Sequence, residues 1–168
     1  KQTQAAFDLL DAALTAQPEQ PDLLYETALL AEKLDLMEVM ESRLRKLIEL
    51  RPDSAQAYNA LGYSYAERNI RLIEALALIS KALRIAPNEP FILDSMGWVL
   101  YRQGDLPGAL TYLEQAYALR DDPEVAAHMG EVLWTLGRVE DAQRTLHEAQ
   151  KKHPTNEALT AAVKKFAP

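Results

Sequence analysis

The chain has 168 residues and contains no cysteine, which excludes disulfide bonds, thiolate chemistry and cysteine-ligated zinc. It also lacks an apolar run approaching the roughly 18 residues of a membrane-spanning helix, so we expect no direct insertion into a membrane. No signal peptide is apparent and the first residue is Lys1 rather than Met, so we expect the chain to be excised from a longer protein. Its composition, 48% hydrophobic, is typical of one folded all-α domain.

Positive charge is also in short supply. The 18 lysines and arginines are outnumbered by 25 aspartates and glutamates, and the net charge is −7. No stripe of basic residues could neutralise phosphates, so nucleic acid is disfavoured as a partner, as is an anionic membrane surface. We expect most of these charges to form a solvated acidic surface.

Residues suited to catalysis or metal binding are equally few. The chain has three histidines, and none has a second histidine at metal-ligand spacing. His147-Glu148 begins like a zinc-protease helix, but Lys151 stands where the closing histidine would be. The glycines occur singly, so no phosphate-binding loop is formed. We therefore expect no catalytic residue, no metal and no cofactor, and a chain that is not an enzyme.

What the sequence does contain is a block that recurs about every thirty-four residues. The clearest copies run from Asn59 to Pro87, from Asp94 to Leu119 and from Ala127 to Pro154. In each copy a glycine is followed by a large residue three positions on, by an alanine about twelve positions on and by a second alanine seven later. A fixed period of this length indicates stacked helical hairpins, which offer a binding surface and rarely a reaction site.

There is a physical reason for a glycine at the same place in each of these repeats. Gly62, Gly97 and Gly130 stand at equivalent places in their helices, although glycine inside a helix costs about 1 kcal/mol. A larger side chain there would push the two helices of the hairpin apart, so close packing is predicted. The second repeat has one extra residue in its turn, 68–71, and we expect this insertion to loosen its hairpin.

The period predicts about ten helices in a single solenoid. Residues 21–54 are a degenerate repeat, with Ala28 in place of the glycine and Met40 in place of the first alanine. The expected segments are the second helix of a truncated repeat at 1–20, repeats at 21–54, 55–89, 90–122 and 123–156, and a capping helix at 157–168.

These residues resemble the tetratricopeptide repeat (TPR) family. In the repeat at 90–122 the signature positions hold Leu93, Met96, Gly97, Leu100, Ala109, Leu113 and Ala116, with Asp121 in place of the usual proline. The resemblance implies a right-handed superhelical solenoid of antiparallel helix hairpins. It also implies a concave groove, lined by the first helix of each hairpin, that holds a peptide or a helix of a protein partner.

Two segments, 92–110 and 122–138, are similar to proteobacterial envelope TPR lipoproteins, among them adaptors of a carboxy-terminal processing protease. This similarity implies a place in the periplasm or at the periplasmic face of the outer membrane. The lysine and asparagine with which some TPR proteins clamp the tails of heat-shock chaperones are absent, because those positions hold residue pairs such as Tyr25 and Leu29.

The family pattern also indicates which side chains face the groove. Our candidates for a peptide groove are Tyr25, Asn59, Tyr63, Phe91, Asp94, Trp98, Tyr101, Arg102, Glu131 and Trp134. Tryptophan, tyrosine and arginine are the side chains most enriched at binding hot spots. In the alternative interpretation each aromatic ring packs against the next hairpin, and Asn59 is an ordinary surface amide.

Two classes of function remain open. The first is a non-catalytic protein-interaction module, a scaffold or an adaptor, that binds its partner in the groove. The second is a structural element that oligomerises through helix ends or convex faces. An apolar stripe on residues 1–16, formed by Ala6, Phe7, Leu10, Ala13 and Leu14, favours the second class, since a free apolar face needs a partner.

Overall fold

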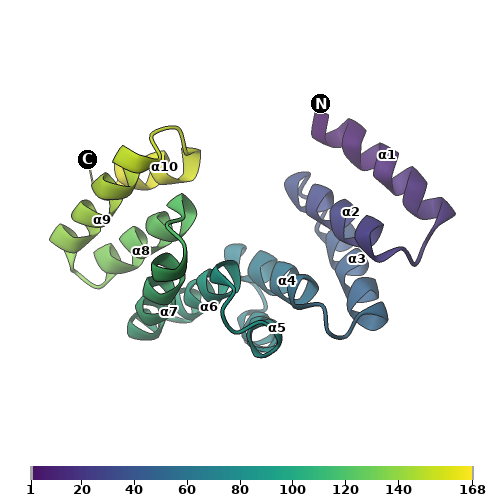
Figure 1. The fold of residues 1–168 in the computed structure, drawn as a ribbon, viewed down its shortest axis with the longest axis horizontal. Coiled ribbons are helices and arrows are strands. Elements are labelled where there is room, and N and C mark those ends of the chain that lie inside the picture. Colours follow the sequence, from purple (N-terminus) through teal and green to yellow (C-terminus); the bar gives the residue numbers. More distant parts are fainter. Residues whose placement is uncertain (1, 168) are drawn as a thin grey trace. The chain divides into compact units, whose positions relative to one another are not determined.

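The computed structural model describes residues 2–167, and within them it contains ten α-helices and no strand. The all-α class predicted from the repeat is therefore confirmed. The helices follow one another through short turns (Figure 1). They are α1 (Gln2–Ala16), α2 (Pro21–Lys33), α3 (Met37–Leu50), α4 (Ala55–Glu67), α5 (Leu72–Ile85), α6 (Pro90–Gln103), α7 (Leu106–Leu119), α8 (Pro123–Thr135), α9 (Val139–Lys152) and α10 (Glu157–Phe166).

The helices group into two compact units, one ending at Ala86 and the other beginning at Pro87. In the first unit α1 packs on α2, and α2 with α3 and α4 with α5 form hairpins. In the second unit α6 pairs with α7 and α8 with α9, while α10 packs against both α8 and α9. Each unit thus has its own layer of first helices, α2 and α4 in one and α6 and α8 in the other.

In the α4–α5, α6–α7 and α8–α9 hairpins the two helices meet at a glycine. A Cβ atom added to Gly97 would lie 2.6 Å from Leu113 Cγ and 3.0 Å from the backbone oxygen of Ala109. The equivalent atom on Gly130 would lie 2.5 Å from Leu146 Cγ. The alanines of the repeat pattern in the second helices are fully buried, so the small residues do allow close contact at these crossings. They are Ala75, Ala82, Ala109, Ala116, Ala142 and Ala149.

The longer turn at 68–71 does not loosen its hairpin, and that expectation was wrong. Asn69 and Arg71 both adopt positive φ angles, 55° and 47°, and this left-handed backbone takes up the extra residue within the turn. Gly62 still lies against Ala75 and Ile79 in the crossing that the other hairpins show. The register of the two helices is therefore kept.

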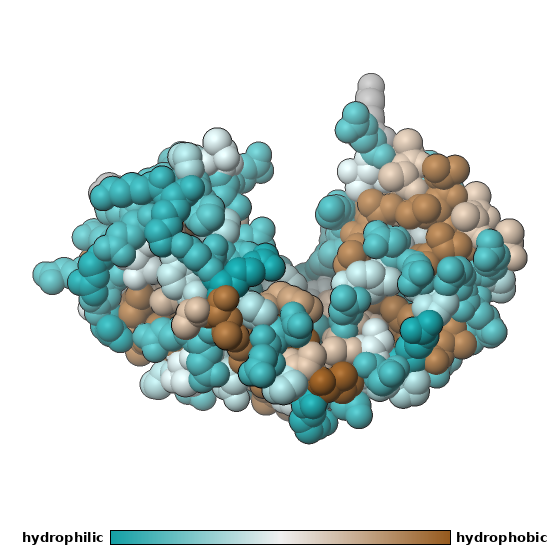
Figure 2. Space-filling view, viewed as in Figure 1, coloured by the Kyte–Doolittle hydropathy of each residue, from teal (hydrophilic) through white to brown (hydrophobic). Residues whose placement is uncertain are grey.

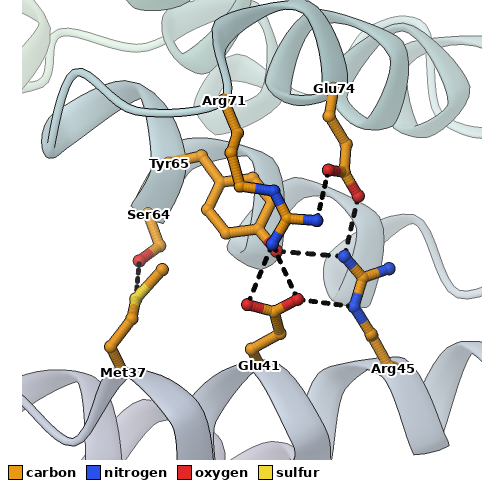
Figure 3. Close-up of polar contacts among 7 residues, drawn as sticks. All are labelled: Met37, Glu41, Arg45, Ser64, Tyr65, Arg71 and Glu74. Atoms are coloured by element: carbon orange, nitrogen blue, oxygen red, sulfur yellow. Dashed lines mark hydrogen bonds and ion pairs between the residues drawn. The ribbon is translucent and has the colours of Figure 1, made fainter.

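A ring of ion pairs around the Tyr65 hydroxyl ties this turn to the preceding hairpin (Figure 3). Arg71 bonds Glu41 at 2.9 Å and Glu74 at 2.6 Å, and Arg45 bonds the same two carboxylates at 2.8 and 2.7 Å. Both arginines also donate to the Tyr65 hydroxyl, at 3.1 and 3.0 Å. Because these residues come from α3, α4, α5 and the turn before α5, the ring holds α4 in place beside α3.

Candidate protein-binding faces

The ten groove candidates divide between the two units, and each set lies on first helices. In the first unit Tyr25 lies on α2, and Asn59 and Tyr63 lie on α4. In the second unit the other seven lie on α6 and α8: Phe91, Asp94, Trp98, Tyr101, Arg102, Glu131 and Trp134. We call these two surfaces the α2/α4 face and the α6/α8 face and describe each by itself.

At the centre of the α6/α8 face, the indole of Trp98 is packed between other side chains. Its ring stacks on the imidazole of His128 with centroids 4.1 Å apart and an angle of 20° between the planes. The guanidinium of Arg102 lies 4.8 Å from the Trp98 ring, and the Tyr101 ring lies 4.9 Å away on the same helix. Trp98 is only 4% exposed. It therefore supports this face from beneath.

Asp94 and His128 join the two helices of this face. Nδ1 of His128 lies 2.8 Å from Oδ1 of Asp94, and Asp94 is one of the few buried charged residues of the chain's described part. Sequence reasoning selected Asp94 but missed His128. The two residues are 34 positions apart, about one repeat length, and a search for polar pairs at that spacing would have found them.

The outer part of the α6/α8 face is polar and aromatic. The Tyr101 hydroxyl donates to Oε1 of Glu131 at 3.1 Å, and Lys165 of α10 lies 3.7 Å from the same oxygen. Burial, with the Glu131 carboxylate adding to it, raises the pKa of Tyr101, so the phenol stays neutral. The exposed aromatics here are Trp134, 37% exposed and 6.0 Å from the ring of Phe166, and Phe91, 40% exposed.

The α2/α4 face contains an amide that lacks a hydrogen bond. Asn59 is 8% exposed, and its buried Oδ1 has no donor within the described chain. It is therefore not the ordinary surface amide of the alternative interpretation. A buried acceptor left without a donor costs about 1–3 kcal/mol, and such atoms are rare in native proteins. On α2, burial and then the charge of Glu26 raise the pKa of Tyr25.

The described residues contain no candidate for a metal site or for a membrane span. Among residues 2–167 no group of three or more histidine, aspartate or glutamate side chains could hold a metal ion. None of the helices described is long and apolar enough to cross a membrane. What the faces do offer is aromatic surface, fixed hydrogen-bonding groups and one unsatisfied acceptor.

Successive helical hairpins, most of them closed by a glycine crossing between their two helices, define a helical repeat protein. Two family models, both described as tetratricopeptide repeat, match residues 41–90 and residues 100–165, together more than half of the chain. The chain belongs to the TPR family.

Known proteins similar to this chain are TPR proteins as well. It is 48% identical over 130 residues to TPR repeat-containing protein PA4667 of Pseudomonas aeruginosa, a match covering 77% of this chain and 22% of that protein. The chain therefore spans about a fifth of that relative's length.

Among solved structures, the chain is similar to the thermophilic TPR protein TTC0263 of Thermus thermophilus. The TM-score is 0.88 at 25% identity, over 98% of this chain and 90% of the other. The TPR protein YrrB, described as having an unusual peptide-binding site, aligns with a TM-score of 0.66 at 22% identity, over 93% of this chain and 82% of the other. These two likenesses support the TPR solenoid predicted from the sequence.

Proposed function

We propose that this chain is a non-catalytic interaction module that binds a peptide or protein segment through its first-helix faces. The observation that carries this proposal is the α6/α8 face, where α8 presents an exposed indole, Trp134, and α6 presents a tyrosine, Tyr101, that is already oriented. The Tyr101 hydroxyl is bonded to Glu131, and the Trp134 ring rests near Phe166. Because these side chains are ordered before binding, a partner would lose little of its binding energy to ordering them.

Aromatic side chains of this kind supply most of the affinity at many interfaces. A tryptophan at a hot spot typically contributes about 2 kcal/mol or more when it is truncated to alanine, which corresponds to about thirtyfold in affinity. Trp134 is exposed enough to be covered by a partner, whereas Trp98 is not. We therefore assign the contact to Trp134, Tyr101 and Phe91, and a supporting role to Trp98.

The resemblances support a location and a role. The similarity of residues 92–110 and 122–138 to envelope TPR lipoproteins favours a scaffold or a protease adaptor in the bacterial envelope. That YrrB is described as having a peptide-binding site supports a peptide ligand for the same fold.

The test compares three forms of the chain as bait in a proteobacterial envelope extract. Wild type, Trp134→Ala and the control Leu119→Ala are each immobilised, and captured proteins are quantified by mass spectrometry. Leu119 is 56% exposed at the end of α7. Its substitution therefore removes exposed apolar surface that lies outside the α6/α8 face. We expect the wild type and the Leu119→Ala variant to capture a protein that the Trp134→Ala variant does not retain. The reason is that loss of the indole should reduce the affinity for this protein about thirtyfold. Equal capture by all three would reject the α6/α8 face as the binding site.

A second function, assembly through α1, rests on a different observation. Leu9 is 70% exposed on α1, and Figure 2 shows hydrophobic surface where α1 lies in Figure 1. Phe7 and Leu14 are buried, so the sequence-predicted stripe is partly covered within the chain. Light scattering after size exclusion decides this function: a dimer that Leu9→Asp turns into a monomer supports it, and a monomeric wild type rejects it.

A further inference from the structure

The hydrogen bond between His128 and Asp94 joins the two helices of the α6/α8 face through a group that can change its charge. Nδ1 of His128 on α8 lies 2.8 Å from Oδ1 of Asp94 on α6. The two side chains are only 15% and 13% exposed. Histidine ordinarily gains or loses its proton between about pH 5 and 8. The strength of this connection between α6 and α8 can therefore vary with pH.

The hydrogen bond becomes stronger when the imidazole of His128 is protonated. A neutral ring with its hydrogen on Nδ1 donates one N–H to the carboxylate of Asp94. A protonated ring adds a full positive charge opposite that carboxylate, and hydrogen bonds between ionised partners are the shorter and stronger ones. Because both side chains are little exposed, salt screens their attraction less than that of a surface pair.

On α6, two charged groups influence the proton of His128. The carboxylate of Asp94 favours protonation, and it acts at hydrogen-bonding distance. The guanidinium of Arg102 opposes protonation, since it lies 4.8 Å from the Trp98 ring on which the imidazole stacks. Coulomb interactions weaken as the separation grows, so the carboxylate in direct contact determines the sign of the effect.

The charges of α8 and α10 near His128 change this balance little. Glu131, one turn further along α8, accepts from the Tyr101 hydroxyl and lies 3.7 Å from the ammonium of Lys165 on α10. Its charge is therefore largely compensated. Glu124, one turn before His128, is exposed to water, which screens it.

The other two helices that pack on α8 contribute no opposing charge. Helix α9 meets α8 at Gly130, against Leu146, and Gly130 lies about 200° around the helix from His128. The charges of α9 are therefore on the far side of α8 from the imidazole. Helix α7 contains one charged residue, Glu114, and this side chain is exposed.

The imidazole is also connected to the residues that we assign to partner contact. Its ring stacks on Trp98 with centroids 4.1 Å apart, and the Tyr101 ring lies 4.9 Å from the same indole. A stronger bond from His128 to α6 holds this stack, and with it Tyr101, in one arrangement. Binding then costs less, because fewer side chains have to be ordered when the partner arrives.

We propose that the Asp94–His128 pair makes partner binding at the α6/α8 face dependent on pH. When His128 takes up a proton, α6 and α8 are held together beneath Trp98, and the face binds its partner more strongly. Asp94 and His128 are positioning residues that act through Trp98 and Tyr101. This inference rests on the proposed function and names the regulation of the same site.

The first test follows the proton in the chain without a partner. In the Trp134→Phe variant Trp98 is the one remaining tryptophan, so fluorescence reports the ring that His128 covers. We expect emission to fall as the pH is lowered from about 8 to 5, because an imidazolium quenches a stacked indole more than a neutral imidazole does. Adding His128→Gln should abolish the change. His147 and His153 remain in both chains, so a change that persists without His128 would overturn the inference.

The second test measures the coupling between the two residues. Asp94→Asn keeps the shape of the side chain and removes its charge, so His128 should bind its proton about tenfold more weakly. Histidine ring signals in NMR give the midpoint, and circular dichroism verifies the fold. The control Glu114→Gln removes an exposed carboxylate of the same unit and should leave the midpoint unchanged. No shift with Asp94→Asn, or an equal shift with Glu114→Gln, would refute the coupling. The fluorescence test does not depend on the folding of Asp94→Asn.

Capture from the envelope extract then distinguishes the two levels of the proposal. We expect the wild type to bind its partner at least about fivefold more strongly at about pH 5 than at about pH 8, and His128→Gln to bind equally at both. The same pH effect in His128→Gln would assign the effect to the partner and reject the regulation. A partner that Trp134→Ala loses, but that the wild type captures equally at both pH values, leaves the proposed function standing and removes the pH dependence.

Discussion

The glycine crossing in the second unit allows a quantitative test of the fold. In Gly97→Ala the new Cβ atom would lie 2.6 Å from Leu113 Cγ and 3.0 Å from the backbone oxygen of Ala109. Alanine improves helix propensity by about 1 kcal/mol, while overpacking in a filled core costs about 1–3 kcal/mol. Since a backbone carbonyl cannot rotate away, we expect a net loss of about 1–2 kcal/mol in the free energy of unfolding.

The side chain that the new methyl group meets gives a second variant. Leu113→Ala alone should cost about 2–5 kcal/mol, because it leaves a cavity in a buried site. In the double variant the methyl group of residue 97 no longer meets Leu113 Cγ, and part of the cavity is filled. The double variant should therefore be more stable than the sum of the single changes predicts, by about 1 kcal/mol or more.

The assay is urea unfolding followed by intrinsic fluorescence. Both tryptophans, Trp98 and Trp134, lie in the second unit, so the signal reports the unit that contains the substitutions. Stability is taken from the midpoint and the slope of each transition. If the two changes add to within about 0.5 kcal/mol, the residues are not coupled and the assigned helix crossing is refuted.

Three further results are expected. Tyr65→Phe removes the hydroxyl that two arginines bond and should cost about 1 kcal/mol in urea unfolding followed by circular dichroism; unchanged stability would show that the ring of ion pairs does not depend on it. The hydrogen bond from Arg45 holds the pKa of Glu74 below 4.5. Its stabilisation should therefore be complete above pH 4.5 and disappear as the pH falls through the lower folded value. Glu74→Gln should flatten that pH dependence, and an unchanged acid profile would contradict the pairing. Asn156→Ala removes the cap of α10, worth about 1 kcal/mol, and should shift Trp134 fluorescence to the red as α10 frays; an unshifted spectrum would mean that α10 does not cover that ring.

Some features of the site could be predicted from the sequence, and others could not. The periodicity identified the first helices and the positions on them, because helix register determines which side chains share a face. The periodicity could not determine how deeply each side chain is buried. Trp98 and Trp134 were selected by the same rule, yet one is buried and the other is 37% exposed. His128 covers Trp98 from the neighbouring helix, and a single repeat read alone does not contain that contact.

The sequence by itself determined the class of this protein. Glycines and alanines at a fixed period predict helices that cross closely, and such hairpins bury their apolar faces only against each other. The tertiary structure decided which polar groups are satisfied, because hydrogen bonds and ion pairs between repeats depend on side chains about one repeat length apart. The Asp94–His128 pair, the ring around Tyr65 and the unsatisfied oxygen of Asn59 all arise where neighbouring helices meet, and helix periodicity carries no information about those distances.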